Sequence, residues 1–205
     1  MSLKNTSYWE NKEVTSEEKA IFKYLKKKKF LKKPNVLHVG IGNSHGLINL
    51  KNKFNSFIGL TIAGLEKNKA DKLNIDSNNN YLIDKHDADA MASLIRSDSI
   101  DYIIDINLKS FSPSNDLFEL MIINYVNFLK RGGSILTSDS GMKWTTSLSL
   151  KEGVFEQGQG NNSNLLSKDE LYTIAYNNNL KVETFTFSIG LIKRKKEILY
   201  KLTKS

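Results

Sequence analysis

One short segment of the chain has the residue types that let a ligand approach the backbone. Residues 36–44 read Val-Leu-His-Val-Gly-Ile-Gly-Asn-Ser, so a largely apolar run ends in Gly40 and a second glycine, Gly42, follows after one residue. Between a strand and a helix, glycines at this spacing permit a sharp turn and leave space for a ligand against the main chain. Gly-x-Gly turns are common, so the motif predicts a binding turn without identifying its ligand.

Polar residues also follow a second apolar segment. Residues 100–106 read Ile-Asp-Tyr-Ile-Ile-Asp-Ile, which predicts a fully buried strand, and Asp105 and Asn107 lie at its carboxyl end. Ligands of open α/β sheets bind at this end of the strands. An aspartate there can orient or deprotonate a substrate. The alternative is a buried acid whose hydrogen bonds are purely structural.

The composition limits the class of protein. A chain of 205 residues with 40% hydrophobic and 25% charged residues predicts a single globular domain over 1–205. No apolar run approaches the roughly 18 residues of a membrane helix, and the polar N-terminus is not a secretory signal. The chain has no cysteine, which excludes disulfides, zinc-thiolate sites and thiol nucleophiles. We expect a cytoplasmic protein, because a cysteine-free chain suits a reducing compartment.

The chain is basic, with a net charge of +8. Only three of its 30 basic residues, Arg96, Arg131 and Arg194, are arginines, and asparagine is abundant as well. This enrichment in lysine and asparagine favours a biased composition over selection for a polyanionic partner. Nucleic-acid readers usually carry arginine for bidentate contacts to bases and phosphates. We therefore expect a small-molecule substrate, with nucleic acid as the alternative, and the sequence does not define an oligomeric state.

The hydrophobic pattern alternates between strands and helices. Capping boxes at Thr15–Glu18 and Ser167–Glu170 predict helix starts, the first within an N-terminal helical segment over 1–33. Residues 141–166 lack periodicity and predict a mobile loop. Strands are expected at 36–39, 57–62, 81–83, 100–106, 134–137 and 182–188, with a closing hairpin arm over 190–202. The predicted fold is α/β: a doubly wound, mostly parallel seven-stranded sheet with a C-terminal antiparallel hairpin and helices on both faces.

These motifs, in this order, resemble those of the class I S-adenosylmethionine (SAM)-dependent methyltransferases, which have a Rossmann-like fold. The first motif of that family is an apolar strand ending in Gly-x-Gly, matched by Gly40 and Gly42. An Asp-Ala pair belongs to the third strand, matched by Asp87-Ala88, and an Asp begins the fourth, matched by Asp101. Residues 129–133 look like the family's Leu-Lys-Pro-Gly-Gly turn, which predicts a helix ending at its two glycines.

The chain departs from this family at the second strand. Family members usually end that strand with an acid, whose two oxygens accept hydrogen bonds from both ribose hydroxyls of the cofactor, but here Thr61 takes its place. The strand 1 acid is missing too. The segment 61–66 is similar to a Thr-Leu-Ser-x-x-Gln phrase of the cyclopropane fatty-acid synthase branch, where the residue five after the threonine contacts ribose. By that resemblance Glu66 binds the ribose; the alternative is an ordinary exposed glutamate of a helix.

The resemblance implies further SAM contacts. Asp87 would accept a hydrogen bond from the adenine amino group while the Ala88 amide contacts a ring nitrogen; the alternative for Asp87 is a solvated turn aspartate. Asn43, beside the glycine turn, and Asn107, after the fourth strand, would complete the cofactor site. Asp105 is then the candidate catalytic residue, which would orient or deprotonate the acceptor.

Asp105 and Asp139 are also similar in position to the magnesium ligands of the catechol-type methyltransferases. Oxygen ligands suit a hard cation. Ser140 stands where that family has an asparagine, which leaves only two acids. We therefore expect no metal, and name Asp105 and Asp139 as the pair that would hold one.

The resemblance predicts methyl transfer from SAM to a small or medium-sized acceptor. Transfer from a sulfonium is an in-line displacement that needs mainly proximity and alignment, so a missing acid or base argues little against activity. A non-catalytic, nucleoside-binding protein of Rossmann-like fold that lost the ribose acid is the first alternative. A dinucleotide oxidoreductase is the second, and it is disfavoured because His45 replaces the third glycine of Gly-x-Gly-x-x-Gly.

Overall fold

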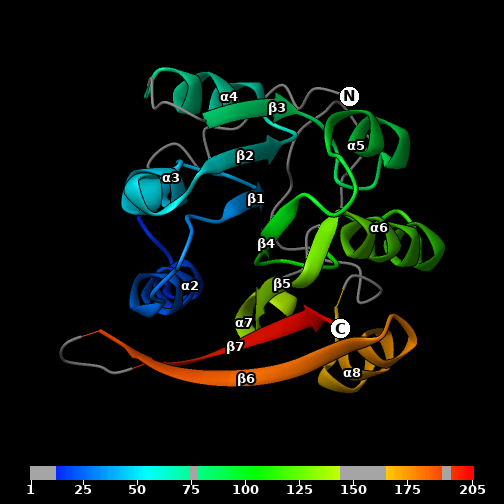
Figure 1. The fold of residues 1–205 in the computed structure, drawn as a ribbon. Helices are drawn as coiled ribbons and strands as arrows, with labels where there is room; N and C mark the ends of the chain where they lie inside the picture. Colours follow the sequence, from blue (N-terminus) through cyan, green and yellow to red (C-terminus); the bar gives the residue numbers. More distant parts are fainter. Residues whose placement is uncertain (1–12, 74–77, 144–164, 191–194) are drawn as a thin grey trace.

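A seven-stranded sheet forms the centre of the computed structural model, which describes residues 13–73, 78–143, 165–190 and 195–205 (Figure 1). The strand order is β3-β2-β1-β4-β5-β7-β6. The strands are β1 Asn35–Val39, β2 Ser56–Thr61, β3 Asn78–Leu82, β4 Ile100–Asp105, β5 Leu129–Ser138, β6 Leu180–Ile189 and β7 Lys195–Lys204. Strands β1 to β5 pair in parallel, whereas β7 is antiparallel to both β5 and β6. The predicted mostly parallel sheet with its closing antiparallel hairpin is confirmed.

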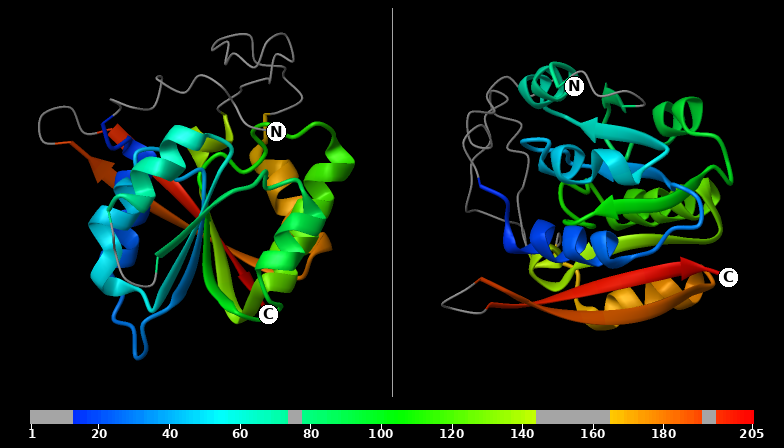
Figure 2. Two further views of the ribbon diagram at one scale, coloured as in Figure 1. Left: turned by 90° about the horizontal axis from the view of Figure 1, so that it is seen from above. Right: turned by 60° about the vertical axis from the view of Figure 1, so that its left-hand side comes forward.

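Helices cover both faces of the sheet, as predicted. Figure 2 (left) shows α2, α3 and α4 on one side of the strands and α5, α6 and α8 on the other. The helices are α2 Ser16–Lys27, α3 His45–Leu50, α4 Gly64–Asp71, α5 Ala88–Leu94, α6 Asn115–Phe128, α7 Asp139–Met142 and α8 Lys168–Asn177, with a short 3-10 turn at Lys51–Lys53. Each face has its own buried hydrophobic cluster, one built around α6 and the other around α2. Among the described helices, none is long and apolar enough to cross a membrane.

Local sequence determines where several helices begin. Both predicted capping boxes are present: the side chain of Thr15 accepts from the amide of Glu18, and that of Ser167 from the amide of Glu170. In each box the glutamate carboxylate also accepts from the amide of the capping residue. Two amides at each helix start are satisfied in this way, so the helices begin where the sequence indicates.

The predicted end of helix α6 is wrong. The helix expected to run to Gly132-Gly133 ends at Phe128, and Leu129 is already extended, with φ −67° and ψ 133°. Leu129 is fully buried and pairs with Ile100 of β4, so burial of this side chain starts the strand before the glycines. The register then shifts, and residues 130–133 form an irregularity between the two paired parts of β5.

The structure describes only part of the predicted N-terminal helical segment over 1–33 and of the predicted mobile loop over 141–166. Within 1–33, helix α2 ends at Lys27, earlier than predicted. Most of the predicted mobile loop, residues 144–164, lies outside the described residues, and so do residues 1–12. Of the residues at the two ends of that loop, Met142 belongs to α7 and Leu166 is buried in the hydrophobic core.

Candidate functional site

A cavity of about 340 Å³ lies at the carboxyl ends of the central parallel strands. Its lining residues come from the segments 13–18, 39–45, 60–66, 83–85, 105–111 and 140–141. Three of these segments contain the ends of β1, β2 and β4, and the segment 83–85 directly follows β3. The other two contain the start of α2 and part of α7. This is the position in which open α/β sheets bind ligands, because the loops after the strands diverge there.

The glycine turn after β1 forms part of this cavity. Gly40 and Gly42 both have positive φ, +69° and +48°, and a Cβ atom built on either would meet no atom within 4 Å. The amides of Gly40 and Ile41 donate to the carbonyl of Leu60, at 2.9 and 3.2 Å, which ties the turn to the end of β2. The backbone conformation therefore favours glycine at both positions, and the space beside them is open to the cavity.

Glu66, predicted from the sequence as a ribose ligand, lines the cavity and is only 8% exposed. Its Oε2 accepts a hydrogen bond from the Thr61 hydroxyl at 2.5 Å. Burial raises the pKa of the Glu66 carboxyl, against the lowering effect of hydrogen bonds from Thr61 and from the backbone of Gly42. The Thr61 hydroxyl also accepts from the amide of Ala63 at 3.0 Å, so it holds Glu66 in place. The alternative interpretation of Glu66 as an exposed helix residue is wrong.

Asn43 and Asn107, the two predicted amide ligands, also line the cavity. The Asn43 side chain is buried and its Oδ1 accepts a hydrogen bond from Lys69 Nζ at 3.0 Å. Asn107 contributes its backbone carbonyl to another contact, with Lys85 Nζ at 3.0 Å. Both residues therefore lie where the sequence places them, one in the loop after β1 and one in the loop after β4.

Asp105, the predicted catalytic residue, lines the cavity but is part of a buried ion pair. Lys85 Nζ lies 2.9 Å from Asp105 Oδ2 and 3.2 Å from Oδ1. The hydroxyl of Tyr125 donates to Oδ2 at 3.0 Å. Burial, followed by the charge of Asp105, raises the pKa of Tyr125 well above its ordinary value, so the phenol stays protonated as the donor. Both oxygens of Asp105 are thus engaged by donors from the protein.

The residues directly after β3 line the cavity, whereas the predicted adenine ligands do not. Asp84 and Lys85 belong to the lining, and Asp87 and Ala88 are outside it. Asp87 is the N-cap of α5, where its Oδ1 accepts from the amide of Ala90 at 3.0 Å. Asp84 Oδ1 accepts from the amide of His86 at 3.0 Å and lies 2.9 Å from the same residue's Nδ1.

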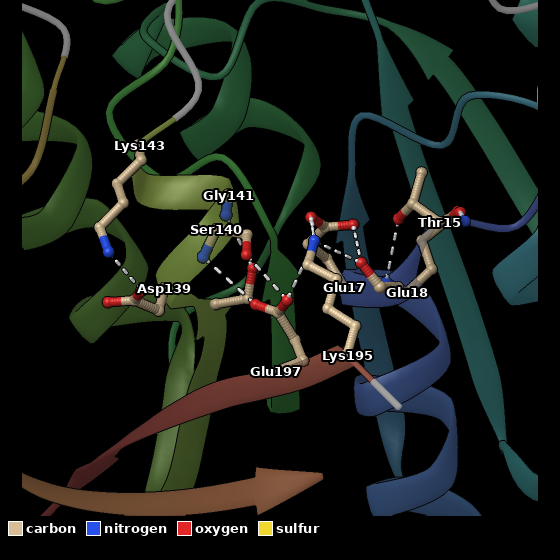
Figure 3. Close-up of polar contacts among 11 residues, drawn as sticks. Thr15, Glu17, Glu18, Asp139, Ser140, Gly141, Lys143, Lys195 and Glu197 are labelled. Atoms are coloured by element: carbon tan, nitrogen blue, oxygen red, sulfur yellow. Dashed lines mark hydrogen bonds and ion pairs between the residues drawn. The ribbon is translucent and has the colours of Figure 1, made fainter. Parts of the chain in front are cut away.

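A polar cluster borders the cavity between α2, α7 and β7 (Figure 3). The buried carboxylate of Glu197 accepts two hydrogen bonds from Ser140, from the amide at 3.2 Å and from the hydroxyl at 2.8 Å. Lys195 Nζ lies 3.7 Å from Glu197 Oε2 and 3.6 Å from Glu17 Oε1. Figure 3 shows Lys195 between these two carboxylates. Strand β7 therefore connects the start of α2 to α7, and Glu17 and Ser140 both line the cavity.

The acids named as a metal-binding pair have separate partners. Asp139 does not line the cavity, and its carboxylate contacts Lys143 Nζ at 2.5 Å and the Tyr200 hydroxyl at 3.4 Å. Asp105 is bound by Lys85, as described above. Within the described parts of the chain, no group of three or more histidine, aspartate or glutamate side chains is arranged to hold a metal ion.

No protein-family model matches this sequence, and no curated protein does. Solved structures match its fold. The N-methyltransferase NodS from Bradyrhizobium japonicum WM9, in complex with S-adenosylhomocysteine (SAH), is similar with a TM-score of 0.65 and 12% identity, over 99% of this chain and 94% of NodS. The magnesium protoporphyrin IX methyltransferase ChlM from Synechocystis PCC 6803, with bound SAH, has a TM-score of 0.62 and 14% identity, over 91% of this chain and 81% of ChlM.

A third similar structure is the CurJ carbon methyltransferase, with a TM-score of 0.60 and 16% identity. The match covers 92% of this chain and 53% of CurJ, so the chain spans about half of that protein. The strand order and these likenesses agree. The chain has the class I methyltransferase fold. The similarity lies in the fold, since fewer than one residue in five is identical in any of the three.

In this methyltransferase fold, sequence reasoning missed three kinds of cavity residue. Asp84 and Lys85 follow the predicted third strand directly, so the rule that ligands bind at strand ends would have selected them instead of Asp87. Glu17 carries a helix-start signal, but nothing in the sequence places that helix at the cavity. Phe111 lines the cavity with a positive φ of +62°, a conformation that its local sequence does not indicate.

Proposed function

We propose that this protein binds SAM in the cavity and transfers its methyl group to a small or medium-sized acceptor. The observation that carries the proposal is the position of Glu66. Its buried carboxylate lies beside the glycine turn at the ends of β1 and β2, held by a hydroxyl and by a backbone amide. Both donors are neutral and occupy only part of the hydrogen-bonding capacity of the carboxyl group, which has lone pairs left to accept the two hydroxyls of a ribose.

The charge of the lining supports a cationic ligand over a polyanionic one. The chain as a whole carries a net charge of +8, but the described cavity lining contains six acids and one lysine. The acids are Glu13, Glu17, Glu18, Glu66, Asp84 and Asp105. SAM carries a sulfonium, an ammonium and a carboxylate group and so is positively charged overall, whereas a dinucleotide carries a pyrophosphate, which an acidic lining repels.

Asp84 takes the adenine role that the resemblance suggested for Asp87. It is the second residue after β3 and lines the cavity. Contacts with His86 occupy its Oδ1 and fix the orientation of the carboxylate. Burial would raise the pKa of Asp84, but the hydrogen bonds from His86 and the nearby charges of His86 and Lys85 together outweigh it and the net shift is downward, so the group remains an acceptor. Its second oxygen then accepts from the adenine amino group.

The proposed chemistry requires alignment more than proton transfer. When bound, the sulfonium supplies an activated methyl group; a lone pair on the acceptor forms the new bond to carbon as the carbon–sulfur bond breaks. The protein's part is to hold the cofactor and to admit the acceptor in line. Asp105 is not assigned as the base, because Lys85 and Tyr125 already bind both of its oxygens.

The same engagement of Asp105 favours a second candidate function, a nucleoside-binding protein without catalysis. The two candidates share the cofactor site and differ in turnover. Incubation of the protein with methyl-labelled SAM and a small-molecule extract separates them. Labelled product with stoichiometric SAH supports the methyltransferase, and binding of SAM without any SAH formation supports the non-catalytic protein.

Calorimetry with SAH and with NAD tests the shared cofactor site. We expect SAH to bind with a dissociation constant in the micromolar range and NAD to give no isotherm. An isotherm for NAD and none for SAH would contradict the proposal. Asp84→Asn provides a further test, because it exchanges one acceptor oxygen for a donor nitrogen: SAH affinity falls while homocysteine-containing fragments without adenine are unaffected.

A further inference from the structure

Lys85 is a buried cation at the edge of the cavity with acceptors on several sides. The residue is 7% exposed, and its Nζ contacts both oxygens of Asp105. It also donates to two backbone carbonyls, those of Asn107 and Leu108, each at 3.0 Å. An ammonium group has three donor hydrogens, so these contacts use its full hydrogen-bonding capacity.

These contacts join two loops whose strands are not neighbours. Lys85 follows β3, whereas Asp105 ends β4, and β2 and β1 lie between those strands in the sheet. The cation therefore reaches across the carboxyl edge of the sheet. No hydrogen bonds of the β-ladder connect β3 to β4, so the side-chain contact supplies a direct connection between the two loops.

One carbonyl that Lys85 contacts also belongs to a turn in the loop after β4. The carbonyl of Asn107 accepts from Lys85 and also from the amide of Ser110 at 2.9 Å, which closes a turn. Phe111 follows with a φ of +62°, unfavourable for an aromatic residue and maintained only where the surroundings hold it. Asn107, Ser110 and Phe111 all line the cavity.

We propose that Lys85 is a positioning residue, whose ammonium group holds the loop after β4 at the distance from the loop after β3 that the cofactor requires. The identity of the ligand rests on the proposed function. The claim that Lys85 holds the loop after β4 in place does not depend on that function. Asp105 is then the counter-ion of Lys85 and the acceptor for Tyr125, which explains why a carboxylate at the strand end has no free oxygen.

The test uses the double variant Lys85→Met/Asp105→Asn. Methionine keeps the length of the side chain, and asparagine keeps an acceptor for the Tyr125 hydroxyl, so neither charge remains buried without its partner. The matched control is Lys109→Met. Lys109 is equally buried and belongs to the same loop, but its ammonium faces Glu170 at 3.7 Å and the ring of Phe118, and it does not line the cavity.

Two measurements are made on each folded variant. Amide hydrogen exchange without ligand should be at least tenfold faster than wild type at residues 107–111 in the double variant, with the central strand β5 unchanged. SAH affinity should fall at least tenfold in the double variant and by less than twofold in Lys109→Met. A purely stabilising role of Lys85 would instead raise exchange throughout the sheet in proportion to the lost stability.

Wild-type exchange at residues 107–111 together with wild-type SAH affinity in the double variant would overturn the proposal. If the wild-type protein itself fails to bind SAH, the proposed function fails, and the exchange measurement still decides whether Lys85 holds the loop. If the double variant does not fold, the single variant Lys85→Arg is measured, since a guanidinium keeps the charge but its planar fork cannot reproduce the four contacts. Faster exchange at 107–111 in Lys85→Arg supports the proposal, and unchanged exchange and affinity contradict it.

Discussion

Glu66 and Asp105 are both buried carboxylates that line the cavity, one in the helix after β2 and one at the end of β4. Glu66 has neutral partners, the Thr61 hydroxyl and the Gly42 backbone. Asp105 has a cation, Lys85, and a phenol, Tyr125. Glu66 has no cationic partner among these contacts, whereas the Lys85 ammonium group already compensates the charge of Asp105. Two carboxyl groups with similar burial and location therefore differ in what a ligand can still offer them.

The largest expected effect comes from breaking the compensated pair. Asp105→Ala leaves the Lys85 ammonium buried without its counter-ion, so we expect the free energy of unfolding to fall by about 3–5 kcal/mol. Urea denaturation measures it. Asp139→Ala is the control, because its ion pair with Lys143 is partly exposed and should contribute about 1 kcal/mol or less. A loss below that of the control would mean that Asp105 is not compensated as described.

A third buried titratable group, His38, extends the comparison to a side chain with no polar partner. It is 1% exposed, and among the described residues neither ring nitrogen has a hydrogen-bond partner. Burial lowers the pKa of His38 to about 4. The unfolded chain binds a proton near pH 6.5 and the folded protein does not, so stability falls as the pH drops from 6.5 towards 4.

This contribution amounts to about 3 kcal/mol by pH 4. Denaturation at several pH values should therefore show a steeper acid loss in the wild type than in His38→Leu. Leucine fills a similar volume beside Phe57 and Gly46 without titrating. Identical pH profiles for the two proteins would show that His38 is protonated or solvated in the folded state.

Glu66 is tested through ligand affinity. Glu66→Ala should weaken SAH binding by roughly 1.5–3 kcal/mol, the range for hydrogen bonds to a charged group. Calorimetry measures the affinity of wild type and variant for SAH and for its 2′,3′-dideoxy analogue. Removal of the two ribose hydroxyls should lower the affinity of the wild type more than that of the variant. Equal losses in both proteins would remove Glu66 from the ribose site. Thr61→Val should weaken SAH binding less, because it removes one hydrogen bond that orients the Glu66 carboxyl group but leaves that group in place.

The smallest effect is expected at Asp87, which caps α5 outside the cavity. Asp87→Ala should lower the free energy of unfolding by about 1 kcal/mol, the usual contribution of an N-cap. SAH affinity should stay unchanged in the folded variant. A tenfold loss of affinity would instead return the adenine role to Asp87 and remove it from Asp84.

Much of the fold could be predicted because its signals are local. The capping residues Thr15 and Ser167 act on amides three residues away, and the strands appear as short apolar runs. The predicted end of α6 is wrong because a contact distant in the sequence, and not a local signal, decides it. Glycines at 132 and 133 suggest a helix end, but burial of Leu129 against β4 starts the next strand first.

The sequence by itself determined the strand–helix order, the glycine turn at Gly40 and Gly42, and the presence of an acid five residues after Thr61. These three features depend on backbone conformation and on the spacing of residues that are near one another in the sequence. Only the tertiary structure decided that Lys85 neutralises Asp105, because the two residues are 20 positions apart and meet through the arrangement of non-neighbouring strands. It also decided that Glu66 is buried and faces the cavity, since a helix pattern does not specify what covers each of its sides.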